Sequence, residues 1–382
     1  MPKHLLDSIL EKLVSSVDYL QFGTVCGLWN TVAKENQNKQ IKRSFNHDHV
    51  PMLLVSNTEK EYSWKVYNAI ENRFVEPEIV VPYGKRLSSS GGWLIAVNSD
   101  FTVTLYKPFS MADANATIHL PCLFPPDEDD PEIYMEYVED CYNHVSKATM
   151  TADPVANPDD CILVVLYGSY REMALIRPAK DTAWTKIVVD ATTMPWDMMC
   201  QKNDMYVLQQ GGELHYCDIS DPCNLKIKLI ASKISVPNYF VFSKRYLVKS
   251  RRGELLQVLR YLNWPDDGDR LRETMQVRVY KLELKGSRWV DIEDLDDDNA
   301  LFLGDNSSIC VAASNFVGCQ PNCIYFTHDY DTVGIGGVGP VDIGVYHLKD
   351  RSLTLGYNMD SETIAKMRAR PPIWVVPTLN FH

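Results

Sequence analysis

The sequence has no apolar run that approaches the roughly 20 residues needed to cross a bilayer as a helix. It is also short of positive charge, since 38 Lys and Arg face 50 Asp and Glu and leave a formal net charge of -12. Binding to a nucleic-acid backbone requires a basic surface, so neither nucleic acid nor a membrane is an expected partner. What remains is a chain of 382 residues, 45% hydrophobic and 23% charged, with the composition of a globular protein of two or three domains.

A secretory signal is also lacking, because Asp7 interrupts the apolar stretch at the start of the chain. The ten cysteines are scattered, from Cys26 to Cys323, in a chain too large to need disulfide bonds for stability. We therefore expect reduced thiols and an intracellular protein, located in the nucleus, the cytoplasm or both.

Motifs of catalysis and metal binding are missing as well, since the sequence contains neither G-x-S-x-G nor H-E-x-x-H. Cys319, Cys323 and His328 form the only close group of Cys and His, whereas a zinc site normally offers two tight pairs of ligands. The run 334–339 has the spacing G-x-G-x-x-G, but Pro340 and a strand-like segment follow it where a dinucleotide site needs a helix. No catalytic residue, metal ligand or cofactor is predicted.

The first forty residues have a helical pattern. Leu5, Leu6, Ile9 and Leu13 fall on one side of a predicted first helix, and Asp18 has the chemistry of an N-cap for a second. Phe22, Val25 and Cys26 continue the spacing in the second helix, and Trp29, Val32 and Ala33 repeat it in a third. Three such short helices bury too little apolar surface by themselves, so the pattern predicts a small module that binds a partner.

The order of these residues resembles the F-box of plant F-box proteins. The resemblance rests on Pro2, Leu5, Leu6, Ile9, Leu13, Asp18, Phe22, Val25, Cys26 and Trp29. It implies that the first helix presents Pro2, Leu5, Leu6 and Ile9 to a Skp1-type adaptor, and Leu13 belongs to the same predicted surface. Phe22, Val25, Cys26 and Trp29 would be shared between the core of the module and the adaptor. Simple docking of the helices onto the next domain is the alternative.

After residue 43 the pattern changes to short strands separated by turns. Three strands are predicted at 52–56, 63–69 and 74–80, and a clear hairpin joins 92–98 to 102–106. About six such groups follow one another at a spacing of about 50 residues, which favours a β-propeller over a β-sandwich or two barrels.

This second part resembles the F-box-associated domain of plants known as DUF295. The resemblance rests on Gly92-Trp93-Leu94, the hairpin from Asn98 to Phe109, Val279-Tyr280, Trp289-Val290 and Pro371-Pro372-Ile373-Trp374. The predicted fold is therefore mainly β with a small N-terminal all-α module. Residues 1–43 form a three-helix F-box, residues 52–382 form a propeller-like domain of about six blades, and a short helix over 360–370 precedes the C-terminal segment.

One basic cluster contrasts with the acidic chain. Lys244, Arg245, Lys249, Arg251 and Arg252 lie on one predicted hairpin. Charges on a solvated strand edge discourage aggregation, and this is the simpler interpretation. The alternative is a surface that recognises an acidic or phosphorylated partner through arginine side chains.

The two resemblances together imply a non-enzymatic subunit of an SCF (Skp1–cullin–F-box) E3 ubiquitin ligase. Its partners would be a Skp1-like adaptor, the cullin and RING subunits reached through that adaptor, and an unknown protein substrate that is marked for proteasomal degradation. One alternative is a stoichiometric regulator that sequesters a signalling protein without ubiquitylating it. Another is a propeller enzyme with two facing carboxylates.

Overall fold

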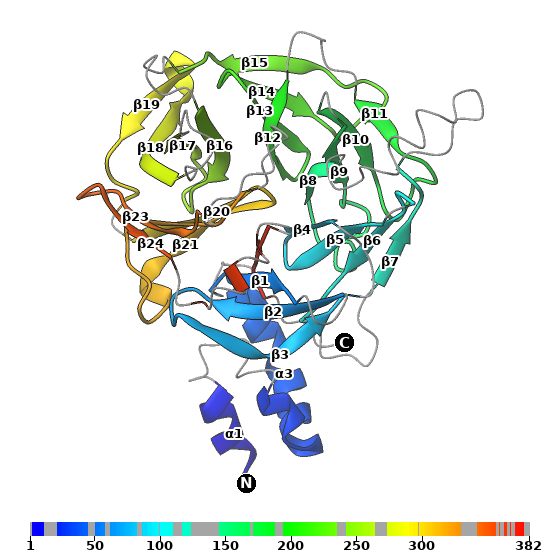
Figure 1. The fold of residues 1–382 in the computed structure, drawn as a ribbon. Helices are drawn as coiled ribbons and strands as arrows, with labels where there is room; N and C mark the ends of the chain where they lie inside the picture. Colours follow the sequence, from blue (N-terminus) through cyan, green and yellow to red (C-terminus); the bar gives the residue numbers. More distant parts are fainter. Residues whose placement is uncertain are drawn as a thin grey trace.

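The fold is that of a computed structural model (Figure 1), which describes residues 2–10, 21–44, 50–57, 62–81, 86–98, 100–109, 117–123, 145–168, 171–187, 194–234, 242–263, 273–296, 298–329, 342–356, 359, 363–364, 367 and 371–377. A helical part, α1 (Lys3–Leu10), a turn of helix at 21–24 and α3 (Gly27–Ser44), precedes a ring of β-sheets. Within the described residues, no helix combines the length and the apolar character required to span a membrane.

Six sheets form the blades of the ring. From the centre outward, blade 1 contains β25 (Ile373–Val375), β1 (Met52–Ser56), β2 (Ser63–Asn68) and β3 (Arg73–Val80). Blade 2 contains β4 (Arg86–Ser90), β5 (Trp93–Val97), β6 (Val103–Tyr106) and β7 (Thr117–Leu120). Blade 3 contains β8 (Val145–Met150), β9 (Leu163–Tyr167), β10 (Glu172–Ile176) and β11 (Thr185–Ile187).

The other three blades continue around the ring. Blade 4 contains β12 (Pro195–Gln201), β13 (Asp204–Gln209), β14 (Leu214–Asp218) and β15 (Ile227–Ala231). Blade 5 contains β16 (Phe242–Lys249), β17 (Leu255–Asn263), β18 (Glu273–Glu283) and β19 (Arg288–Ile292), with the 3-10 turn η1 (Leu284–Gly286) before β19. Blade 6 contains β21 (Ser307–Ala312), β20 (Asn299–Gly304), β22 (Cys323–Phe326), β23 (Gly344–His347) and β24 (Ser352–Leu355), with η2 (Ala313–Asn315) after β21.

The innermost strands β25, β4, β8, β12, β16 and β21 contact one another in turn around the centre. The circle closes because β25, at the end of the chain, pairs antiparallel with β1 at the start of the ring, with Leu53 opposite Trp374. Both ends of the ring therefore belong to blade 1, as Figure 1 shows.

Blade 6 departs from the regular order. In the other blades that are built from consecutive strands, the chain moves outward from the innermost strand, but here β20 precedes the inner strand β21. As a result β20 pairs antiparallel with β21 and parallel with β22, with Leu301 opposite Ile324.

An apolar cluster fills each of the six junctions between neighbouring blades. On β9, Leu163 and Val165 pack toward blade 2, whereas Val164 and Leu166 pack toward blade 4. Since successive residues of a strand point to opposite faces, both faces of the blade are buried. This explains why central strands such as β5 are continuous apolar runs.

The predicted fold class is confirmed: the protein is mainly β, with N-terminal helices and a six-bladed propeller. Of the short helix predicted over 360–370, the structure describes Thr363, Ile364 and Met367, which are helical, and the rest of that prediction falls outside the described residues. The predicted glycine loop 334–339 also falls outside them.

Candidate functional site

The helical module has its own small core. Leu6 and Leu10 of α1 pack against Phe22 and against Val32 and Ala33 of α3, and all five are buried. Leu6 and Leu10 are one helical turn apart, which places them on the same side of α1. Among the described residues, no side chain of the propeller belongs to this core.

Polar contacts fix how α1 lies against α3. Asn36 Nδ2 donates a hydrogen bond to Asp7 Oδ1 at 2.7 Å, and Lys3 forms an ion pair with Glu35. These contacts connect the start and middle of α1 to the same stretch of α3, so the outer faces of the two helices are displayed in a defined arrangement.

Three large apolar side chains of the module point to solvent. Leu5 is 45% exposed, Val25 is 59% exposed and Leu28 is 49% exposed. Pro2 and Cys26 are exposed beside them in the sequence. We call Leu5, Val25 and Leu28 the exposed apolar triad.

The predicted adaptor-binding residues divide between this surface and the core. Ile9 and Trp29 are half-buried, and the Trp29 ring lies 4.4 Å from the ring of Phe22. Leu6, expected to face the adaptor, is fully buried within the module, and Phe22 is buried beside it. Leu13 lies outside the described residues.

Leu28 was not among the predicted residues. It follows Gly27, the first residue of α3, and does not belong to the spacing of Trp29, Val32 and Ala33 that forms the buried side of α3. A leucine off the buried spacing of a helix is expected to face solvent, so this was the signal that could have identified it.

The basic residues of the β16–β17 hairpin do not form one continuous patch. Lys244 and Arg245 are neighbours on β16 and therefore point to opposite faces of the blade. Four of the five have polar partners: the contacts are Lys244–Asp305 (3.4 Å), Lys249–Gln201, Arg251–Asp298 (3.6 Å) and Arg252–Asp296 (3.2 Å). The hypothesis that this hairpin binds an acidic partner stays a prediction.

The centre of the ring is held together by buried polar side chains. Asp197 on β12 forms an ion pair with Lys147 on β8 and accepts a hydrogen bond from the backbone N of Leu247 on β16 at 2.7 Å. One carboxylate thus joins the innermost strands of blades 3, 4 and 5. Between blades 1 and 6, Ser307 Oγ donates to the carbonyl O of Trp374 at 2.9 Å.

A second buried ion pair connects blade 2 to the turn after β8. Lys107 Nζ lies 2.8 Å from Asp153 Oδ2, and Trp93 Nε1 donates to the same oxygen at 2.9 Å. Burial would raise the pKa of Asp153, but the hydrogen bonds from Lys107 and Trp93 outweigh it and hold that pKa below its usual value. The carboxylate is therefore charged at neutral pH.

Comparison with known proteins fits this architecture. The family model described as the KIB1-4 β-propeller matches residues 66–347, which is more than half of the chain. The chain belongs to the KIB1-4 β-propeller family.

The relatives of this KIB1-4 propeller protein include F-box proteins of Arabidopsis thaliana. F-box protein SKIP23 is 27% identical, over 98% of this chain and 94% of that protein. F-box protein At2g17036 is 23% identical over the same shares, and F-box protein At4g35733 is 21% identical over 93% of this chain and 92% of that protein. The predicted resemblance to a plant F-box protein with a propeller domain is confirmed.

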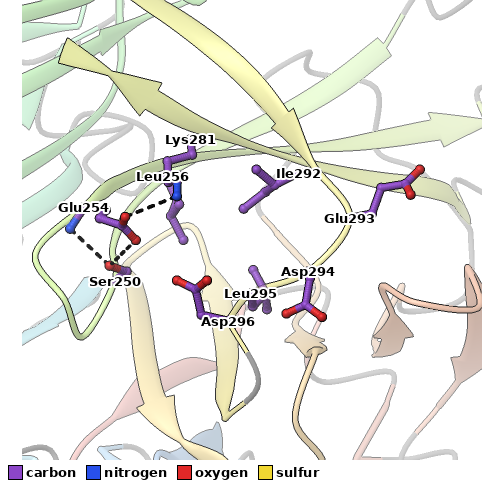
Figure 2. Close-up of a pocket in the computed structure, with 9 residues that line it drawn as sticks. All are labelled: Ser250, Glu254, Leu256, Lys281, Ile292, Glu293, Asp294, Leu295 and Asp296. Atoms are coloured by element: carbon purple, nitrogen blue, oxygen red, sulfur yellow. Dashed lines mark hydrogen bonds and ion pairs between the residues drawn. The ribbon is translucent and has the colours of Figure 1, made fainter. Parts of the chain in front are cut away.

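Between blades 5 and 6 the KIB1-4 propeller contains a pocket of ≈ 230 Å³. Figure 2 shows its apolar lining, which includes Leu256, Ile292 and Leu295, and the ion pair of 3.2 Å between Lys281 and Glu254 at one side. The pocket has the size of a single side chain or a small ligand.

The three acidic residues on the other side of this pocket already have partners. Their ion pairs are Arg252–Asp296 (3.2 Å), Lys349–Asp294 (3.1 Å) and Arg351–Glu293 (2.5 Å). Because each carboxylate is matched by a basic side chain from a neighbouring turn, the acidic rim has little excess charge to attract a ligand.

Three cysteines of the propeller lack the environment of a nucleophile. Burial raises the pKa of Cys161, Cys200 and Cys323 to about 12, so these thiols are protonated at neutral pH. Cys323 Sγ lies 3.1 Å from Nδ1 of His347, whereas the Nδ1 of His328 accepts a hydrogen bond from the backbone N of Asp342. In the part of the chain that the structure describes, no three His, Cys, Asp or Glu side chains are grouped as metal ligands.

Proposed function

We propose that this protein is the substrate-recognition subunit of an SCF-type E3 ubiquitin ligase. The observation that carries the proposal is the exposed apolar triad, which faces solvent although the module has a core of its own. The F-box relatives that match nearly the whole chain support it. We expect a Skp1-like adaptor to cover the triad, and the cullin and RING subunits to follow through that adaptor.

The driving force of this docking is the removal of apolar surface from water. Each Å² of apolar surface that the adaptor covers contributes about 25 cal/mol, and a few central side chains usually dominate such an interface. Leu5, Val25 and Leu28 are the exposed large hydrophobic side chains among the described residues of the module. Pro2, Ile9, Cys26 and Trp29 would complete the surface around them.

The propeller would hold a protein substrate while the other subunits supply the chemistry. Tethering raises the effective concentration of the substrate lysines near the ubiquitin-charged enzyme. The closed ring of six blades would be a rigid support for the substrate, because every blade packs on both neighbours. No residue of this chain needs to form a covalent bond.

The test is adaptor binding by the full chain and by the double variant Leu5→Asp, Val25→Asp. Two carboxylates on the contact surface should weaken binding to a plant Skp1 homologue by at least about 30-fold, the effect of losing a dominant contact residue. The matched control is Leu229→Asp, on the outer strand β15, where the leucine is 57% exposed. Its binding should equal that of the wild type.

If the double variant is folded and still binds the adaptor, the proposed docking surface is wrong. If the adaptor binds but the abundance of the captured partner does not depend on the proteasome, the protein is a stoichiometric regulator instead. We also propose that it resides in the nucleus, the cytoplasm or both, and the localisation of a fluorescent fusion tests this.

A further inference from the structure

A buried glutamine at the junction of blades 4 and 5 has no hydrogen-bond partner. Gln257 on β17 is 0% exposed, and neither its Nε2 nor its Oε1 makes a hydrogen bond. Buried polar atoms in native proteins are almost always paired, with protein, water or a ligand. An amide with both ends unpaired therefore indicates a group that the protein chain itself does not supply.

Arg245 shares this face of the blade. Gln257 lies opposite Leu247 in the sheet, and Leu247 packs in the apolar cluster between blades 4 and 5. Arg245 is two residues before Leu247 on β16, so its side chain points to the same face. Its Nη1 is buried and also lacks a hydrogen-bond partner.

The two side chains meet at a glycine of blade 4. A Cβ on Gly212, in the turn between β13 and β14, would lie 2.8 Å from Arg245 Nη1 and 3.2 Å from Gln257 Nε2. Gly212 has φ +97, which also excludes most other residues. On another side Trp289 Nε1 donates to the carbonyl O of Gly212 at 3.2 Å. Two nitrogen donors without acceptors therefore lie next to each other above this turn.

The charge of Arg245 distinguishes it from the other arginines nearby. Arg251, Arg252 and Arg260 each form an ion pair with an aspartate, whereas Arg245 forms none with any described residue. Burial lowers the pKa of Arg245, and the attraction of nearby groups, including the Glu213 carboxylate, offsets this only in part. The Arg245 side chain as a whole is half-buried and reaches solvent, whereas its Nη1 and the Nε2 of Gln257 are themselves buried.

We propose that Arg245 and Gln257 bind a small oxyanion, a phosphate or carboxylate group, against the Gly212 turn. The oxyanion would accept hydrogen bonds from Arg245 Nη1 and Gln257 Nε2 and would neutralise the guanidinium. Gln257 Oε1 requires a donor, which a protonated phosphate oxygen offers and a carboxylate does not. The site is therefore expected to prefer hydrogen phosphate to acetate.

The test uses the full chain in chloride, sodium phosphate or sodium acetate at equal ionic strength. We expect phosphate to raise the melting temperature in a saturable way and to give a measurable binding isotherm by calorimetry, with a smaller effect of acetate. Arg245→Met and Gln257→Leu should each weaken phosphate binding at least tenfold. The control Arg251→Met removes an exposed arginine of the same hairpin, one already paired with Asp298, and should leave phosphate binding unchanged.

The two test variants also change the protein without ligand. Replacing an unpaired buried polar group by an apolar one of similar shape can be neutral or stabilising, so their melting temperatures in chloride should equal or exceed that of the wild type. A lower melting temperature in chloride, with no phosphate response in the wild type, would mean that buried water satisfies these groups and would overturn the proposal. A full phosphate response in Arg245→Met would also overturn it. Equal responses to phosphate and acetate support an oxyanion site without the expected preference.

Discussion

Arg260 on β17 shows how a single side chain can organise a distant part of the chain. It is fully buried, with Nη1 3.3 Å from Asp329 Oδ2 and Nη2 3.2 Å from Asp342 Oδ2. The Tyr246 hydroxyl donates to Asp329, and burial raises the pKa of Tyr246 so that it stays a neutral donor. One guanidinium of blade 5 thus pairs with two aspartates that are 13 positions apart in the sequence.

Replacing Arg260 by Met should therefore destabilise the protein strongly. The change leaves two buried carboxylates without their cation, which typically costs about 3–5 kcal/mol. The free energy of unfolding from urea titration measures this loss. Arg288→Met is the control, because Arg288 is exposed and its pair with Glu283 is worth about 1 kcal/mol or less. A loss for Arg260→Met as small as that of the control would contradict the expected role.

Leu5 and Leu6 show which properties of a single residue could be predicted from the sequence and which could not. The spacing of apolar residues correctly placed both on a helix of the module. Leu5 faces solvent and Leu6 lies in the core, and this difference depends on where α3 packs against α1. A single helical pattern contains no information on the neighbour that will cover it, so the exposed side of the module could not be derived from spacing alone.

At the scale of elements, most second and third strands of the blades were predicted, whereas several innermost strands and the outermost strand β7 were missed. The predicted segments 52–56 and 63–69 correspond to β1 and β2, but β4, β8 and β12 were not predicted. These inner strands contain serine, lysine and aspartate because they join the blades through polar contacts such as Lys147–Asp197. Their sequences lack the continuous apolar character of a strand buried on both faces, which was the signal used.

The strand β25, which closes the ring, is expected to contribute strongly to the stability of the propeller. Trp374 is 0% exposed, its Nε1 donates to the carbonyl O of Leu303 at 3.0 Å, and it packs in the cluster between blades 1 and 6. Trp374→Ala should lower the free energy of unfolding by about 3–5 kcal/mol, measured by chemical denaturation. Val317→Ala is the control, because Val317 is 97% exposed and its loss should change stability by less than about 0.5 kcal/mol. A stable Trp374→Ala variant would mean that the ring does not depend on this closure.

At the scale of the whole molecule, the helical module and the propeller have separate cores. No residue of the six junction clusters precedes Val50, and the core of the module ends at Ala33. A protein of residues 50–382 should therefore unfold at the same temperature as the full chain within about 2 °C, since it keeps every residue of the junction clusters. It should not bind the adaptor. A propeller that is unfolded without the helices, as judged by circular dichroism and calorimetry, would show that the two parts depend on each other.

The closure of the ring by β25 also sets an order of events during synthesis. The F-box helices leave the ribosome first, but blade 1 lacks its innermost strand until residues 373–375 have been made. At roughly 5–20 residues per second, the intervening stretch of about 330 residues takes on the order of 15–65 s to translate. Throughout that interval the nascent chain would contain the helices that we propose bind the adaptor, together with an unfinished propeller. Translation that stops early is then expected to release a product that binds the adaptor but no substrate. Such a product would compete with the intact protein for the adaptor.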